Sequence, residues 1–131
     1  MSAIPVILCG KTAQIAAGVT AGLKPEFNVI STLLSLPSAK STIPSLLQTT
    51  PAKAVVCGGG YCAEDVGEMI KACEAGEGVR GVGWYRVDST IPSPPLGPAY
   101  GKAVVDRFKA RFVEVEEKKE KVGDGHETFL F

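Results

Sequence analysis

The sequence is poor in the residues that metal sites and acid–base catalysts most often use. It has one histidine, His126, and 4 cysteines, and no two cysteines form a Cys-x-x-Cys pair. Structural zinc sites need two close pairs of Cys or His ligands, and thiol redox enzymes use Cys-x-x-Cys. We therefore expect no metal site and no thiol redox activity, and we expect the cysteines to be free thiols.

An excess of one charge and long apolar runs are also missing. The chain has 14 Lys and Arg against 14 Asp and Glu, and they are spread along its length. Because a nucleic-acid-binding surface needs clustered basic residues, neither DNA nor RNA is expected as a partner. No apolar stretch approaches the length of a membrane span, and residues 1–5 lead into a predicted strand without a charged leader. These features predict a soluble, cytoplasmic protein without a membrane partner.

Hydrophobic segments are abundant, and their spacing alternates between the two-residue period of strands and the 3.6-residue period of helices. The 131 residues are 45% hydrophobic, which is enough to bury the core of one domain. Strands and helices are predicted to alternate, with strands at about 4–9, 27–33, 52–57 and 79–87 and helices at about 11–23, 43–48, 63–75 and 99–121. This order predicts a single-domain three-layer α/β fold, Rossmann-like or flavodoxin-like. Its sheet is expected to be mainly parallel with four to five strands, helices on both faces and right-handed crossovers.

The domain is predicted to span residues 1–122, followed by a short tail at 123–131. The tail ends in Phe129-Leu130-Phe131, which is unusual for a solvated segment. An apolar end of this kind docks either on the edge of its own sheet or on a second subunit. If the tail docks on a second subunit, the protein is a homodimer.

Two predicted strands end in glycine-containing turns that each lead into a helix. In a parallel sheet such turns meet at one edge, where glycine permits close approach of a ligand and helix N-termini attract anions. This predicts a small-molecule or cofactor site made of Gly10, Lys11, Thr12, Gly58, Gly59, Gly60 and Tyr61. Tyr61 is either stacked on a flat ligand there or part of the core.

Arg86 and Asp88 alternate along the fourth predicted strand, so they share one face at the same edge. Together with Lys11 they form the candidate catalytic set. Asp88 is the candidate acid/base, and the two cations are expected to hold negative charge. The alternative is a structural ion pair between Arg86 and Asp88.

Cys9 and Cys57 stand at the ends of the first and third predicted strands. The helix that follows Cys57 favours a reactive thiol, because a helix N-terminus lowers a thiol pKa. The alternative is that both cysteines are small buried packing residues, since no histidine stands near them in the sequence to act as a base.

The stretch from Cys9 to Ala16 resembles the first turn of atypical short-chain dehydrogenases/reductases. In that family a Gly-x-x-Gly-x-x-Gly turn binds the pyrophosphate of NAD(P), so the resemblance implies NAD(P) as a cofactor. Gly10 matches the first glycine, whereas Ala13 and Ala16 replace the second and third. The dinucleotide fingerprint is therefore degenerate.

Two further elements of that family's site are missing. No Asp or Glu lies between Glu26 and Glu64 to bind ribose hydroxyls, and no tyrosine has a lysine four residues later. A P-loop is also excluded, because the glycine that it requires five positions before Gly10 is Pro5.

The stretches 84–88 and 94–102 resemble those of a group of small uncharacterised fungal proteins, which brings no established activity. Two hypotheses follow. The first is a small-molecule-binding Rossmann-like protein, and specifically a small metabolic enzyme with a crevice at the carboxyl ends of the strands. The second is a non-enzymatic, dimeric interaction or scaffold module that retains a degenerate dinucleotide site.

Overall fold

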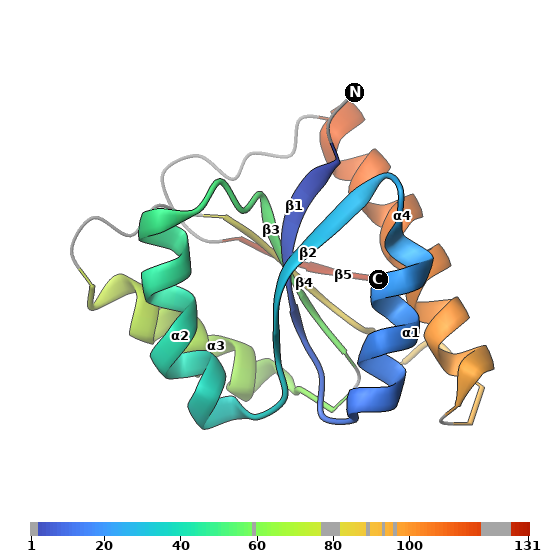
Figure 1. Cartoon of the computed structure of the whole chain (residues 1–131), viewed down its shortest axis with the longest axis horizontal. Helices are drawn as coiled ribbons and strands as arrows, with labels where there is room; N and C mark the ends of the chain where they lie inside the picture. The colour runs from blue at the N-terminus through green and yellow to red at the C-terminus, as the bar shows by residue number, and fades with distance from the viewer. Residues whose placement is uncertain are drawn as a thin grey trace.

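A computed structural model describes residues 3–58, 60–76, 82–88, 90–92, 94–95, 97–118 and 127–131. Strands and helices alternate throughout these ranges (Figure 1). The strands are β1 (Ile4–Cys9), β2 (Phe27–Leu33), β3 (Ala54–Cys57), β4 (Gly83–Arg86) and β5 (Glu127–Leu130). The helices are α1 (Ala13–Leu23), α2 (Leu36–Thr49), α3 (Ala63–Glu74) and α4 (Pro98–Lys118).

The strands form one five-stranded parallel sheet in the order β2-β1-β3-β4-β5. This confirms a single-domain, three-layer α/β fold, and the strand order is the flavodoxin-like one. The chain runs outward from β1 to β2 and then crosses back to β3 on the other side of β1. The topological switch point therefore lies between β1 and β3, which is where open α/β sheets bind ligands.

Each face of the sheet has its own core. Val6 and Leu8 of β1 pack with α1 and α4, whereas Ile7 and Cys9 pack with α2 and α3. Figure 1 shows the two helix pairs on opposite sides of the sheet. Because successive side chains of a strand point to opposite faces, both sets are buried and the strand is apolar throughout.

The last crossover has the opposite hand to the other three. The chain passes from β1 to β2 in one direction through α1, and from β4 to β5 in the other direction through α4, yet both helices cover the same face. Helices α2 and α3 cover the opposite face while the chain moves toward β4. The expectation of right-handed crossovers throughout is therefore wrong for the β4–α4–β5 unit. As a consequence, α4 lies beside α1.

Helix α2 begins at Leu36, and the prediction that it starts near Ile43 is wrong. The side chain of Ser35 accepts a hydrogen bond from the backbone N–H of Ser38 at 3.3 Å and caps the helix. Pro37 occupies the first turn, where no backbone N–H is needed. The helix continues through Pro44, which would lie in the first turn of a helix that began near Ile43.

The C-terminal residues complete the sheet. Residues 127–130 form β5 and pair with β4, with Phe129 opposite Tyr85. Phe129 and Phe131 are buried, and the ring of Phe131 lies 5.8 Å from that of Phe108 in α4. In the structure the apolar end thus docks on its own sheet, while the predicted boundary at residue 122 lies outside the described residues.

Candidate functional site

A cavity of about 290 Å³ lies at the switch point. Both glycine turns contribute to its wall, through Gly10, Lys11 and Thr12 after β1 and through Gly58 and Gly60 after β3. The opposite wall is formed by α1 and α4. The structure thus brings together five of the seven predicted binding residues, while Gly59 lies outside the described residues and Tyr61 does not line the cavity.

Tyr61 supports the first turn from beneath. Its hydroxyl donates a hydrogen bond to the carbonyl oxygen of Gly10 at 3.0 Å, and its side chain is 1% exposed. Burial raises the pKa of Tyr61 to about 12, so the hydroxyl remains protonated and keeps its donor. Of the two alternatives for Tyr61, the structure supports the core position.

Backbone hydrogen bonds fix the two turns to the sheet. The N–H of Gly10 donates to the carbonyl of Leu33 in β2, and the N–H of Gly58 donates to that of Cys9 in β1, both at 2.9 Å. Each turn is therefore tied to a neighbouring strand, the first to β2 and the second to β1.

Lys11 lies across the second turn. Its ammonium nitrogen is 5.1 Å from the ring centroid of Tyr61, and its stem passes over Gly60. A Cβ on Gly60 would approach Lys11 Cδ to 3.0 Å, so the glycine leaves room for the lysine. Within the described residues Lys11 forms no ion pair. The lysine therefore places a positive charge at the cavity rim without an ion-pair partner in the described part of the chain. A backbone hydrogen bond from Cys62 and, more weakly, the charge of Lys11 lower the pKa of the nearby Asp65 carboxylate.

The start of α1 adds to this positive potential. Thr12 precedes the helix without a side-chain capping hydrogen bond, so its hydroxyl occupies none of the first-turn N–H groups. These donors and the positive end of the helix dipole favour an anion or a carbonyl oxygen. Thr12 itself lines the cavity.

Arg86 and Asp88 are placed apart from this cavity. Cys9, Cys57 and Arg86 stand in register on β1, β3 and β4, so Arg86 is two strands, or about 10 Å, from the end of β1. Neither Arg86 nor Asp88 lines the cavity. No ion pair joins these two residues within the described part of the chain.

Asp88 is bound within its own turn. Its carboxylate accepts hydrogen bonds from the N–H and the hydroxyl of Thr90, at 3.0 and 2.6 Å. These bonds, followed by the charges of Arg107 and Arg86, lower the pKa of Asp88. A carboxylate that is ionised at neutral pH can stabilise a positive charge or act as a general base, but it has no proton to donate as a general acid. Nε of Arg86 is buried without a hydrogen-bond partner in the described residues. The catalytic roles of Asp88 and Arg86 stay predictions.

Cys9 and Cys57 are neighbours, as the strand order requires, and both are fully buried. A hydrogen bond between the two thiols, followed by burial, raises the pKa of Cys57 well above its ordinary value. The thiol therefore stays protonated, which favours the packing alternative over a reactive thiol.

Sequence reasoning missed the helical half of the cavity. Ile15 and Val19 of α1 and Tyr100 and Val104 of α4 line it. An apolar helix face predicts only burial in the core, so the sequence gives no sign that these residues border a cavity.

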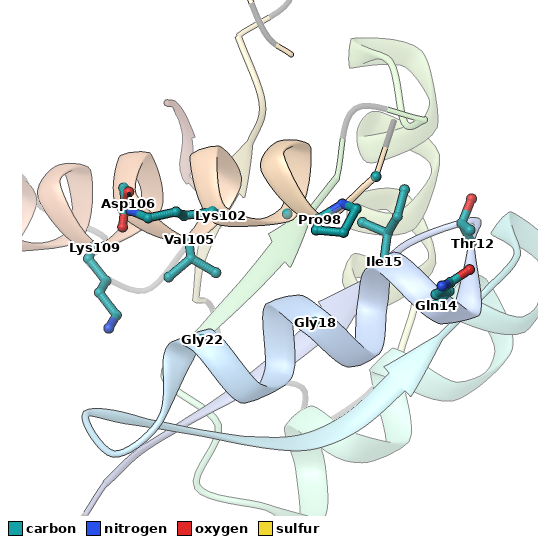
Figure 2. Close-up of a pocket in the computed structure, with 12 residues that line it drawn as sticks. Thr12, Gln14, Ile15, Gly18, Gly22, Pro98, Lys102, Val105, Asp106 and Lys109 are labelled. Carbon is teal, nitrogen blue, oxygen red and sulfur yellow. Dashed lines mark hydrogen bonds and ion pairs between the residues drawn. The ribbon is translucent and has the colours of Figure 1, made fainter. Parts of the chain in front are cut away.

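A longer groove adjoins the cavity. It has a volume of about 650 Å³, runs between α1 and α4, and shares Thr12 and Ile15 with the cavity (Figure 2). Gly18, Gly101 and Val105 contribute to its floor and walls. The two hollows therefore lie next to each other on the α1/α4 side of the molecule.

The residues beside β2 do not fit the ribose of NAD. Ala13 is exposed and borders a depression between α1 and the end of β2, together with Thr32 and Leu34. A dinucleotide site needs a carboxylate at this position for the ribose hydroxyls, and none is present. The described residues around this depression therefore lack the contact that recognises the ribose of NAD.

Two features that other functions would require are missing from the described ranges. These residues contain no group of three or more His, Cys, Asp and Glu side chains arranged to hold a metal ion. None of the helices described combines the length and the apolar character that a membrane crossing requires.

Comparison with known proteins relates the chain to a fungal relative. Kojic acid related protein 6 of Aspergillus oryzae is 42% identical over 125 residues, covering 86% of this chain and 77% of the relative. The chain belongs to the family of kojic acid related protein 6. This relative agrees with the predicted resemblance to fungal proteins. No family model and no solved structure matches the chain.

Proposed function

We propose that this member of the kojic acid related protein 6 family binds a small molecule in the switch-point cavity. The ligand places a carboxylate, phosphate or carbonyl oxygen beside Lys11 and the first turn of α1. The observation that carries the proposal is the position of the cavity, at the point where the strand order reverses and between two glycine turns. Its volume is close to the lower end of the range for small-molecule pockets, about 300–1,000 Å³.

The relative's name connects that protein with kojic acid, an oxygen-rich hydroxypyranone with a ring carbonyl. This class of compound carries the acceptor oxygens that Lys11 and the α1 amides would bind, so kojic acid is a natural first probe. An enzymatic reaction that uses Asp88 and Arg86 requires a ligand that extends across β3, because these residues lie two strands from Lys11.

The test combines native mass spectrometry of freshly purified protein with calorimetric titration of kojic acid, inorganic phosphate and NADP. We expect a co-purified small molecule or binding of at least one probe. Lys11→Ala should weaken that binding at least about tenfold without changing the urea midpoint, because the buried core is untouched. Lys71→Ala on exposed α3 is the matched control. An empty protein that binds none of the probes, or equal affinity in Lys11→Ala, would overturn the proposal.

A second candidate is a homodimeric interaction module joined through β5. Its support is that β5 is the edge strand of the sheet and that Leu130 on it is 41% exposed. Two such edges could pair across a two-fold axis. Light scattering should then give twice the chain mass and a monomer for Leu130→Lys, and a monomeric native chain would reject this candidate.

A further inference from the structure

The groove between α1 and α4 is shaped by glycines. A Cβ on Gly22 would lie 3.0 Å from Cγ2 of Val105, and one on Gly101 would lie 3.8 Å from Cγ2 of Val19. The two helices therefore touch at these positions and close the floor of the groove. A Cβ on Gly18 would meet nothing within 4 Å. A hollow thus remains above Gly18.

This hollow adjoins the switch-point cavity. Thr12 and Ile15 line both, and Figure 2 shows Thr12 and Pro98 at one end of the groove and Gly22 and Lys109 at the other. From Thr12 to Gly22 the helix rises by about 15 Å. A ligand that fills both hollows is therefore elongated.

The groove wall favours an aliphatic ligand over a flat aromatic one. Its apolar part is formed by glycine backbone together with Ile15, Pro98 and Val105, and no aromatic side chain is among its lining residues. Aromatic ligands gain from stacking partners, which are missing there. An aliphatic chain needs only apolar contact, which Ile15, Pro98 and Val105 supply in a wall that also carries polar side chains at its rim.

The charges set the direction of the ligand. Along the groove Lys102 is paired with Asp106 at 2.6 Å, and at the far end Lys109 is paired with Glu26 at 2.8 Å. Lys11, at the cavity end, forms no ion pair within the described residues. Among the described lysines that line the two hollows, Lys11 is the one without an ion pair, so an anionic head group is favoured at the cavity end.

We propose that the ligand is a single-chain amphiphile, with an anionic head in the switch-point cavity and an aliphatic chain in the groove between α1 and α4. The proposal rests on the proposed function, because both place the ligand's oxygen atoms at Lys11. It adds the chemical class of the remaining part of the ligand. Gly18 is the residue that keeps the chain site open.

Straight-chain carboxylates from butanoate to dodecanoate, titrated below their micelle-forming concentrations, test this proposal by calorimetry. Affinity should rise by up to about fourfold for each buried methylene. Gly18→Leu should lower the affinity for dodecanoate at least about tenfold and leave butanoate unchanged, because the new side chain fills the groove only. Gly18→Ala should give a smaller loss, and it keeps the test open if the leucine variant does not fold.

Gly67→Leu is the matched control. Gly67 lies in α3, where an added Cβ also meets nothing within 4 Å, so it reports the effect of the same change on a helix far from the groove. Affinity independent of chain length, or equal losses in Gly18→Leu and Gly67→Leu, would overturn the groove site. In that case the proposed function still stands if its probes bind and Lys11→Ala weakens them, so the two failures are distinguishable. Chain-length dependence without an effect of Lys11→Ala would place the head elsewhere and overturn the proposal.

Discussion

At the scale of single residues, the candidate site depends on contacts that no sequence motif records. The glycines and Lys11 could be predicted, because glycine turns after apolar strands are a local signal. The role of Tyr61 could not, because its partner Gly10 is 51 residues away in the sequence. Only the adjacency of β1 and β3 brings the phenol beneath the first turn.

This contact gives a prediction about stability. Tyr61→Phe removes the hydroxyl that binds the carbonyl of Gly10 at 3.0 Å. The free energy of unfolding should fall by about 1–2 kcal/mol, since a buried acceptor loses its partner. Urea denaturation of the variant measures this. An unchanged free energy of unfolding would show that water replaces the phenol.

At the scale of elements, most helices and strands follow from local patterns, and α2 shows where this fails. The apolar residues of this segment have helical spacing, but it also contains two prolines, Pro37 and Pro44, which locally predict helix breaks. Judged by propensity alone, proline inside a helix is unfavourable by about 3 kcal/mol. Burial of Ala39, Ile43 and Leu47 in the α2/α3 core outweighs this cost.

The cap of α2 gives a second prediction. Ser35→Ala removes the side chain that accepts the hydrogen bond of Ser38, and it should destabilise the protein by about 1 kcal/mol. Ser45→Ala, at an exposed position inside the same helix, is the matched control and should be neutral or slightly stabilising. Urea denaturation compares the two variants. Equal effects would indicate that the helix begins later, near the start predicted from sequence.

At the scale of the whole molecule, the crossover through α4 determines what the protein can bind. If the β4–α4–β5 unit had the usual hand, α4 would cover the same face as α3. The groove against α1 would then be absent. The C-terminal strand holds α4 on the α1 face, because Phe129 and Phe131 pack into that core and Arg107 donates to the carbonyl of Phe131 at 2.8 Å.

A third prediction concerns this strand. Phe129→Ala should destabilise the protein by about 3 kcal/mol or more, because Phe129 is 6% exposed and packs on Tyr85. Leu130→Ala, at the next position of the same strand, should cost less than about 1 kcal/mol, since Leu130 is 41% exposed. Chemical denaturation measures both. Similar losses for the two variants would contradict this placement of β5.

The sequence by itself determined the alternation of strands and helices, the parallel sheet and the two glycine turns, because these depend on periodicity and turn chemistry within a few residues. Only the tertiary structure decided that Arg86 and Asp88 lie away from the cavity, that Tyr61 lies beneath it, and that α4 borders it. These depend on strand order and on the hand of the last crossover. Both are set by burial of apolar faces between segments far apart in the sequence, which local patterns do not encode.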